Sequence, residues 1–377
     1  MTSRERFLTA MTGGQPDRVP CTPDISNMVP CRLTGKPFWE IYLNADPPLW
    51  QAYLDAADYF GIDAWFFEGR LDFQRNGESR TERHITSRSS ERIVEKSRTV
   101  TPEGDLASET TYYVADSPTP TEKPIKDLRE QFHLMPYILR EPESYTTETA
   151  QRQKEAIGEH AFGTHVCFPG FQFWMVWMEG GLDQLAFAMH DCPELLDELC
   201  ALHERVMLRE LEMILDSGLF DFVLLGGSGA ITMASPDLFD RYAFPTIQKA
   251  CRLCRQAGVA TVLHSCGRET HIVKRCAEES ELDCINPLEI PPMGDCAMAT
   301  LKQAYGDKIA LMGNLHTTDV MLLGSADEVG AAARQCIDDA AAGGGFILST
   351  GDQCGRDTPD ENIFALVDAA KTYGAYQ

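Results

Sequence analysis

Short apolar runs that alternate with helical segments constrain the fold of this chain more than any other feature. Seven runs have the apolar, β-branched-rich composition of buried strands: residues 64–67, 163–168, 222–225, 260–263, 283–286, 309–312 and 346–349. Repeated strand–helix units with right-handed crossovers build a parallel sheet, either open and doubly wound or closed into a barrel. Because the alternation runs through most of the chain, we expect an α/β fold of the closed (β/α)8 (TIM barrel) type.

Polar residues mark the points where the intervening helices begin. Ser235 stands directly before a proline, which is typical of an N-cap followed by a first-turn proline. Ser325 and Glu328 have the spacing of a capping box, and Thr358 before a proline predicts another capped start. These starts support helices between the last predicted strands.

The organisation of the chain is predicted to be a single barrel domain over residues 1–377. Residues 1–60 are expected to form an N-terminal helical extension. The polar stretch over 76–123, Arg-rich and then Thr- and Pro-rich, predicts an excursion of strands and loops inserted into the barrel rather than a linker between domains.

The composition indicates in which compartment the protein works and which kinds of partner it is not expected to bind. The 377 residues are 44% hydrophobic, and no apolar run approaches the roughly 20 residues that cross a bilayer. The N-terminal residues lack the apolar region of a secretory signal, and the thirteen cysteines are odd in number without regular close spacing. We therefore expect a cytoplasmic protein with reduced thiols. The formal net charge of −24 argues against nucleic acid and membrane partners.

Four potential metal ligands follow predicted strands. His264 and Cys266 come after the strand at 260–263, Glu289 after that at 283–286, and Cys354 after that at 346–349. In a closed barrel the carboxyl ends of all strands face one mouth, so these side chains are expected to converge there. Imidazole nitrogen, thiolate sulfur and a carboxylate suit zinc better than magnesium or calcium.

An ordinary structural role must be weighed for each of these residues. A His-x-Cys pair arises by chance, and a buried cysteine behaves as a small apolar residue. Glycines at 267, 351 and 355 favour a site, because they permit sharp turns and close approach at the strand ends. Glu289 remains open between a zinc ligand and a solvated loop acid.

Several stretches carry a family resemblance, in order, from one end of the chain to the other. They are "RERFLTAMTGGQPDRVP", "SPDLFDRYAFPTIQKACRLCRQAG", "LHSCG", "DKIALMGNL" and "GGGFILSTGDQCGRDTPDENIFALVDAAKTYG". With them the chain resembles the uroporphyrinogen decarboxylase superfamily. Within it, the chain is similar to the cobalamin-dependent methyltransferase branch, which includes the methylcobamide:coenzyme M methyltransferases. The resemblance implies a (β/α)8 barrel.

The resemblance also implies a zinc site and a corrinoid partner. It carries zinc-ligand roles onto His264, Cys266 and Cys354. Cobalamin-independent methionine synthase has a similar His-x-Cys, Glu, Cys arrangement, which implies a ligand role for Glu289. The corrinoid (cobalamin) would be carried by a separate corrinoid-binding protein and would serve as methyl donor or acceptor.

Two departures from true decarboxylases reduce the expectation of decarboxylation. Those enzymes resemble one another in an arginine-rich N-terminal motif that holds the carboxylates of the tetrapyrrole, whereas "PDISNMVPCRLTG" leaves only Arg32 here. After the strand at 222–225, glycines and Ser228 stand where decarboxylases have an acidic residue. A retained set of zinc ligands would also be unexplained, since the decarboxylases need no metal.

The expected function is therefore zinc-dependent methyl transfer between a small molecule and the cobalt of a corrinoid. The small molecule would be an O-, N- or S-methyl compound, or a thiol acceptor. Glu289 and His316 are predicted catalytic residues, and Trp174, Trp177 and Ser228 are predicted to contact the cofactor or substrate, although an aromatic run such as that at 171–177 is more often core. The alternatives are a non-catalytic corrinoid- or tetrapyrrole-binding barrel and, less favoured, a decarboxylase.

Overall fold

A parallel sheet that curls into a barrel is the centre of the molecule. The computed structural model describes residues 1–75 and 77–376. The sheet has the order β1-β8-β9-β10-β11-β12-β13, and every neighbouring pair is parallel. Its strands are β1 (Trp65–Phe66), β8 (Ala161–Cys167), β9 (Phe222–Gly226), β10 (Ala260–His264), β11 (Cys284–Asn286), β12 (Ala310–His316) and β13 (Phe346–Gly351). Each predicted run overlaps one of these strands, so the predicted alternation is confirmed.

The segment around Cys21 fills the remaining place in the barrel, between β13 and β1. Cys21 forms a parallel bridge with Leu348 of β13, and the Leu348 amide donates to the Pro20 carbonyl at 2.9 Å. On the other side, the amide of Asp63, just before β1, donates to the Cys21 carbonyl at 2.8 Å. The seven strands and this segment together give the eight-part parallel arrangement of the predicted (β/α)8 barrel.

Helix α1 (Ser3–Met11) closes the amino-terminal end of this barrel. Its buried Phe7 lies in one apolar cluster with inward-facing strand residues such as Trp65 and Phe222. The ring centroids of Phe7 and Phe222 are 5.7 Å apart. Because this end is filled by side chains, the carboxyl ends of the strands form the mouth at which a site can be built.

Helices cover the outside of the barrel and bury the apolar outer faces of the strands. They are α4 (Leu49–Phe60), α7 (Glu148–Ile157), α10 (Pro193–Ser217), α12 (Phe244–Ala257), α13 (Thr270–Glu279), α14 (Met298–Tyr305), α15 (Ala326–Ala340) and α16 (Asp360–Thr372). The caps at Ser235 and Ser325 are confirmed. The predicted cap at Thr358 is wrong: α16 begins after Pro359, and the buried Thr358 hydroxyl makes no hydrogen bond to the described residues.

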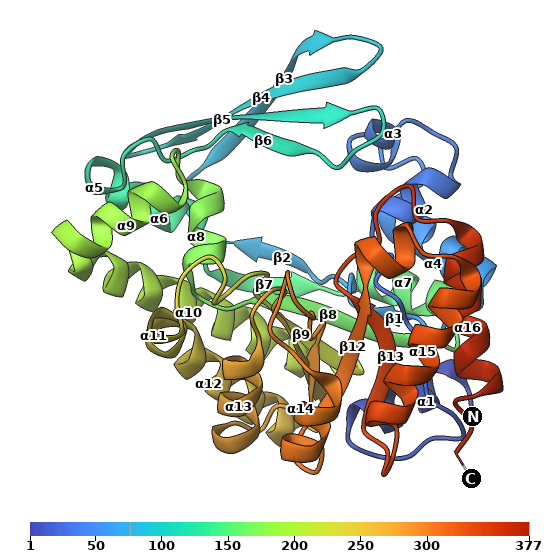
Figure 1. The fold of residues 1–377 in the computed structure, drawn as a ribbon. Helices are drawn as coiled ribbons and strands as arrows, with labels where there is room; N and C mark the ends of the chain where they lie inside the picture. The colour runs from blue at the N-terminus through green and yellow to red at the C-terminus, as the bar shows by residue number, and fades with distance from the viewer. Residues whose placement is uncertain (76, 377) are drawn as a thin grey trace.

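A separate antiparallel sheet lies at the opposite end of the barrel from α1 (Figure 1). It consists of β3 (Arg80–Arg88), β4 (Arg92–Thr101), β5 (Gly104–Tyr113) and β6 (Thr119–Glu122). These strands occupy the segment for which an excursion was expected; residue 76, the first of that segment, and residue 377 lie outside the described residues. A second antiparallel pair joins β2 (Asp72–Arg75) to β7 (Pro142–Thr146).

Short helices complete the chain. They are α2 (Met28–Leu33), α3 (Phe38–Tyr42), α5 (Leu128–Gln131), the 3-10 turn η1 (Phe132–Leu134), α6 (Met135–Ile138), α8 (Phe171–Trp177), α9 (Leu182–Asp191), α11 (Pro236–Leu238) and the π-helical turns η2 (Phe239–Ala243) and η3 (Thr317–Leu322). Helices α1, α2, α3 and α4 lie within residues 1–60, and the non-helical stretch between α1 and α2 carries Cys21, which pairs with β13. In the described part of the chain, no helix combines the length and apolarity needed to cross a membrane.

Candidate metal centre and its cavity

The turn after β10 presents His264 and Cys266 to the mouth of the barrel. His264 is the last residue of the strand, where it lies opposite Gly226 of β9 and Asn286 of β11. Gly267 then adopts a φ of +91°, and a Cβ there would lie 2.1 Å from the Thr232 hydroxyl oxygen. Glycine is therefore required at this position, and the tight turn keeps the imidazole and the thiol on one side of the strand end.

The turn after β13 brings Asp352 to the same place. Asp352 has a φ of +85°, which is uncommon for a residue other than glycine. The Thr350 hydroxyl donates a 2.7 Å hydrogen bond to the Asp352 carbonyl and so stabilises the turn. Strained backbone of this kind is often found at functional sites. Here it directs a carboxylate toward the ligands from β10.

His264, Cys266 and Asp352 form a group that can hold a metal ion. One ligand atom from each residue lies within 4.8 Å of the other two, and the His264 Nε2 to Asp352 Oδ1 distance is 3.9 Å. A nitrogen, a sulfur and an oxygen donor match the ligands that zinc accepts, with three protein ligands leaving a further coordination position for substrate. The sequence interpretation missed Asp352, although its place directly after the strand was a usable signal.

Cys354 and Glu289 lie beside this group without belonging to it. Cys354 is fully buried in the apolar layer outside the barrel, and its amide donates to the Asp24 carbonyl at 2.8 Å. One Glu289 carboxylate oxygen accepts a hydrogen bond from the Gly267 amide. Glu289 therefore supports the turn that carries Cys266. Ligand roles for Cys354 and Glu289 remain predictions.

Negative and potentially negative groups accumulate around His264. Burial raises the pKa of the Cys266 thiol to about 12, with Asp352 and Glu289 adding to the shift and the Ser228 hydroxyl opposing it. Burial likewise raises the pKa of the Asp24 carboxyl, although its hydrogen bond from the Ser26 amide and the nearby His264 lower it. A bound dication would favour the charged forms of these groups. The donor set is thus suited to a cation.

The group opens into a cavity of about 530 Å³, which we call the metal-side cavity. Ser228 and Gly227 line it beside the ligands, and Trp65, Phe67 and Phe173 supply aromatic walls. Its acidic lining residues are Asp24, Glu68 and Asp352, and among the described residues that line it there is no lysine or arginine. Ser228, which was predicted to contact the cofactor or substrate, therefore lines the same cavity as the potential metal ligands, and its contact role stays a prediction.

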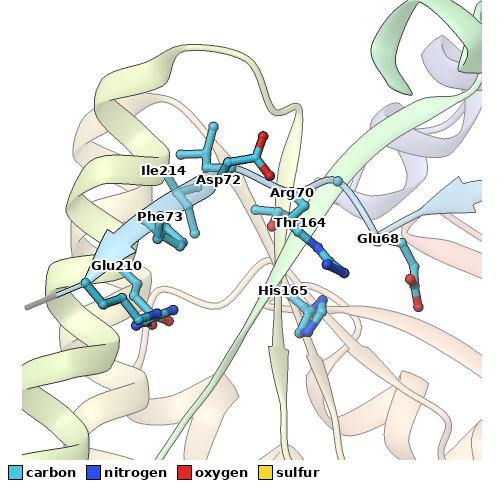
Figure 2. Close-up of a pocket in the computed structure, with 11 residues that line it drawn as sticks. Glu68, Arg70, Asp72, Phe73, Thr164, His165, Glu210 and Ile214 are labelled. Carbon is cyan, nitrogen blue, oxygen red and sulfur yellow. Dashed lines mark ion pairs between the residues drawn. The ribbon is translucent and has the colours of Figure 1, made fainter. Parts of the chain in front are cut away.

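A second cavity of about 530 Å³, which we call the side cavity, adjoins the first through Glu68 and His165. Figure 2 shows it between the segment that carries Arg70, Asp72 and Phe73 and the helix that carries Glu210 and Ile214. Its charged groups include the ion pair of Arg75 Nη1 with Glu210 Oε1 at 2.5 Å. The side cavity contains none of the potential metal ligands.

The other predicted site residues lie away from the lining of both cavities. His316 ends β12, and its Nδ1 accepts a 2.9 Å hydrogen bond from the Asp319 amide, so it caps the turn η3. Trp174 is fully buried on α8 and donates to His203 Nδ1 at 3.2 Å. Trp177 packs against the same His203 ring. Catalytic or cofactor roles for these three residues remain predictions.

Comparison with known proteins places most of the barrel in one family. The family model described as "Uroporphyrinogen decarboxylase (URO-D)" matches residues 113–373. Among solved structures, a methyltransferase from Methanosarcina mazei aligns over 99% of both chains with a TM-score of 0.68 and 18% sequence identity. At that identity, the likeness establishes the shared fold.

Curated relatives match a smaller part of the chain. Methylcobamide:CoM methyltransferase MtbA of Methanosarcina mazei is 26% identical over 163 residues, which are 42% of this chain and 44% of that protein. Methylcobamide:CoM methyltransferase MtaA of Methanosarcina barkeri is 32% identical over 145 residues, 38% of this chain and 39% of that protein. The chain thus covers less than half the length of these relatives.

Proposed function

Because this chain belongs to the uroporphyrinogen decarboxylase family, we propose that it is a zinc-dependent methyltransferase. It moves a methyl group between a small molecule, either an O-, N- or S-methyl compound or a thiol acceptor, and the cobalt of a corrinoid on a separate protein. The observation that carries the proposal is the convergence of His264, Cys266 and Asp352 at the wall of the metal-side cavity. The methylcobamide methyltransferases among its relatives support the same reaction class.

The residues of this chain fit zinc through the chemistry of their donors. His264, Cys266 and Asp352 would hold the ion. The sequence also predicts Glu289 and Cys354 as ligands, but neither belongs to this group of three. When bound, zinc supplies Lewis acidity that stabilises a leaving oxygen, nitrogen or sulfur atom or holds a thiol as thiolate. Asp24 lies close enough to His264 for the imidazole to lower the pKa of its carboxyl, against the raising effect of burial.

The lining of the metal-side cavity argues against decarboxylation of a polycarboxylate. Such a substrate needs cationic side chains, yet the described lining contains no lysine or arginine. Arg32, the arginine left in the N-terminal region, instead pairs with Asp360 at 2.5 Å. Glu68, an acidic residue of the same lining, would add to the repulsion of a polycarboxylate. A methyl compound or a thiol imposes no such requirement.

The partner is proposed to be a corrinoid-binding protein, and the compartment is proposed to be the cytoplasm. All thirteen cysteines are free thiols in the structure, which accords with a reducing compartment. Trp174 and Trp177 do not line the metal-side cavity, so its lining does not support their predicted role in binding the corrinoid.

The first experiment measures zinc and methyl transfer in the same preparations. Protein purified without chelator should contain about one zinc per chain and should convert methylcobalamin in the presence of a thiol, or cob(I)alamin in the presence of a methyl donor. Cys266→Ser should lose both zinc and transfer. Cys200→Ser is the matched control, because Cys200 is also partly buried but lies on α10, where its thiol bonds the Tyr242 carbonyl.

Each result has a definite meaning. Transfer by zinc-free protein would remove zinc from the mechanism. Zinc-loaded protein that shifts the corrinoid spectrum without changing the methylation state would support the non-catalytic binding alternative. Loss of zinc in Cys200→Ser as well would show that the assay reports unfolding.

A further inference from the structure

Two carboxylates tie the turn after β10, which carries Cys266, to the turn after β11. Glu269, on the first turn, is fully buried, and its Oε2 accepts a hydrogen bond from the Leu288 amide at 2.5 Å. In the opposite direction, the Glu289 carboxylate on the second turn accepts from the Gly267 amide on the first. Each turn therefore supplies one backbone amide to a carboxylate of the other.

Leu288 is the residue of the β11 turn that most needs this support. Its φ of +62° lies in the left-handed region, which is unfavourable for a large side chain. Its amide donates to Glu269, and its carbonyl accepts a 2.9 Å hydrogen bond from Nδ2 of the buried Asn314. Strained backbone persists only where surrounding contacts fix it. Loss of the Glu269 acceptor would therefore release Leu288 and change the direction of Glu289, which follows it.

Glu289 connects this pair of turns to the candidate metal ligands. Burial raises the pKa of its carboxyl and Asp352 adds to the shift, while the Gly267 amide and His264 oppose it. The carboxylate thus lies within electrostatic reach of two candidate ligands. Through the Gly267 amide it also holds the backbone directly after the third, Cys266. A displaced Glu289 would leave the Cys266 thiol less firmly oriented.

Separate contacts fix Glu269 itself. The Glu269 amide donates to the Asp295 carboxylate, and the amide of the preceding Arg268 donates to the Thr232 hydroxyl oxygen, each at 2.9 Å. These two acceptors do not depend on the carboxylate that holds Gly267. Glu269 therefore acts from a fixed position on the turn after β11.

We propose that Glu269 is a positioning residue for the metal centre. Through the Leu288 amide it holds the turn after β11, so that Glu289 holds the Gly267 amide and the Cys266 thiol keeps its orientation as a ligand. This inference rests on the proposed function, which it deepens by assigning the side chain that orients a zinc ligand. Groups that support metal ligands in this way set the affinity and the geometry of a site.

The test measures zinc affinity by competition with a chromogenic chelator. Glu269→Leu removes the acceptor and should weaken zinc binding about 10–100-fold, the usual loss when a group supporting a ligand is removed. Glu269→Gln retains an oxygen that can accept from the Leu288 amide and should keep most of the wild-type affinity. Cobalt(II) loaded in place of zinc reports ligand geometry through its visible absorption bands. These bands should shift in Glu269→Leu and not in Glu269→Gln.

Asn362→Leu is the matched control. Asn362 is also buried, and its side-chain amide ties the backbone after β12 by donating to the Met321 carbonyl at 2.9 Å and the Gly324 carbonyl at 2.8 Å. It lines neither cavity. The variant should lower the free energy of unfolding, because it leaves two backbone carbonyls without their donor. Its zinc affinity and cobalt bands should match the wild type.

A double variant tests the path through Glu289. If Glu269 acts through this carboxylate, Glu269→Leu combined with Glu289→Ala should lose no more zinc affinity than the weaker-binding single variant. Additive losses would contradict that path. If Glu269→Leu does not fold, Glu269→Asp takes its place, because it keeps a carboxylate but shortens its reach toward the Leu288 amide, and the same loss is expected.

Wild-type zinc affinity in Glu269→Leu, an equal loss in Glu269→Gln, or an equal loss in Asn362→Leu would overturn the inference. Methyl transfer between methylcobalamin and a thiol is measured on the same preparations. If the wild type binds zinc and transfers methyl while Glu269→Leu binds zinc equally well, the inference fails alone. If Glu269→Leu weakens zinc binding but the wild type transfers no methyl, the proposed function fails alone. A wild type that binds no zinc would overturn both.

Discussion

The two adjoining cavities have the same volume, but they differ in the charged groups and potential metal ligands that line them. Each measures about 530 Å³, and Glu68 and His165 belong to both. In the side cavity, Arg75 and Glu210 satisfy one another. In the metal-side cavity, Asp24 and Glu68 line the same space as the potential metal ligands and the aromatic rings, and the described lining contains no lysine or arginine. Size therefore does not identify the site; unbalanced charge and convergent donors do.

The difference follows from where each cavity lies on the barrel. The metal-side cavity includes groups from the ends of β9, β10 and β13, which converge because all parallel strands point their carboxyl ends to one mouth. The side cavity lies beside residues 68–75 as they leave the barrel, against α10. The strand ends do not converge there, and Arg75 forms an ion pair with Glu210.

The largest effect on zinc affinity should come from removing one of the two candidate ligands in the turn after β13, the carboxylate of Asp352 or the thiol of Cys354. Asp352→Ala should weaken zinc binding by at least about 100-fold, because it removes a direct ligand. Cys354→Ala should weaken it by less than about threefold, because Cys354 is buried outside the cavity lining. Competition with a chromogenic zinc chelator measures both affinities. Equal losses in the two variants would restore Cys354 as a ligand, as predicted from the sequence.

A smaller effect should distinguish two adjacent glycines in the wall of the metal-side cavity. A Cβ at Gly227 would lie 1.9 Å from the Phe168 ring, whereas a Cβ at Gly226 would have no neighbour closer than 3.8 Å. Gly227→Ala should destabilise the fold by about 1–3 kcal/mol, as overpacking does. Gly226→Ala should change stability by less than about 0.5 kcal/mol. Denaturant unfolding measures the free energy of unfolding of the two variants. Equal values would show that the Phe168 ring can move aside without cost.

The smallest effect is expected in the side cavity. Glu210→Gln breaks a partly exposed ion pair with Arg75 and should cost about 0.5–1 kcal/mol of stability. Zinc affinity and methyl transfer should stay at wild-type values, since neither residue lines the metal-side cavity. Thermal unfolding and a zinc titration measure the two quantities. A loss of zinc in this variant would mean that the cavities act as one site.

Much of the barrel and part of the site could be predicted from the sequence. Each predicted strand was found, because a strand buried on both faces leaves a short apolar run that needs no knowledge of its neighbours. His264 and Cys266 were found together because residues two apart at a strand end point to the same side. The cap at Thr358 was wrong because capping depends on whether the hydroxyl can reach a backbone amide, and Thr358 is buried without such a contact.

The sequence by itself determined the alternation of strands and helices, the carboxyl-end location of the donors and the overall negative charge. Only the tertiary structure decided which residue of the turn after β13 faces the mouth. That choice depends on the φ of +85° at Asp352, which brings its carboxylate to His264 and leaves Cys354 buried. It also decided that Trp174 packs into the core of the helical layer while Trp65 and Phe67 line the cavity. The residue type determines which groups a side chain can bind, whereas the backbone conformation and the packing determine which groups lie next to it.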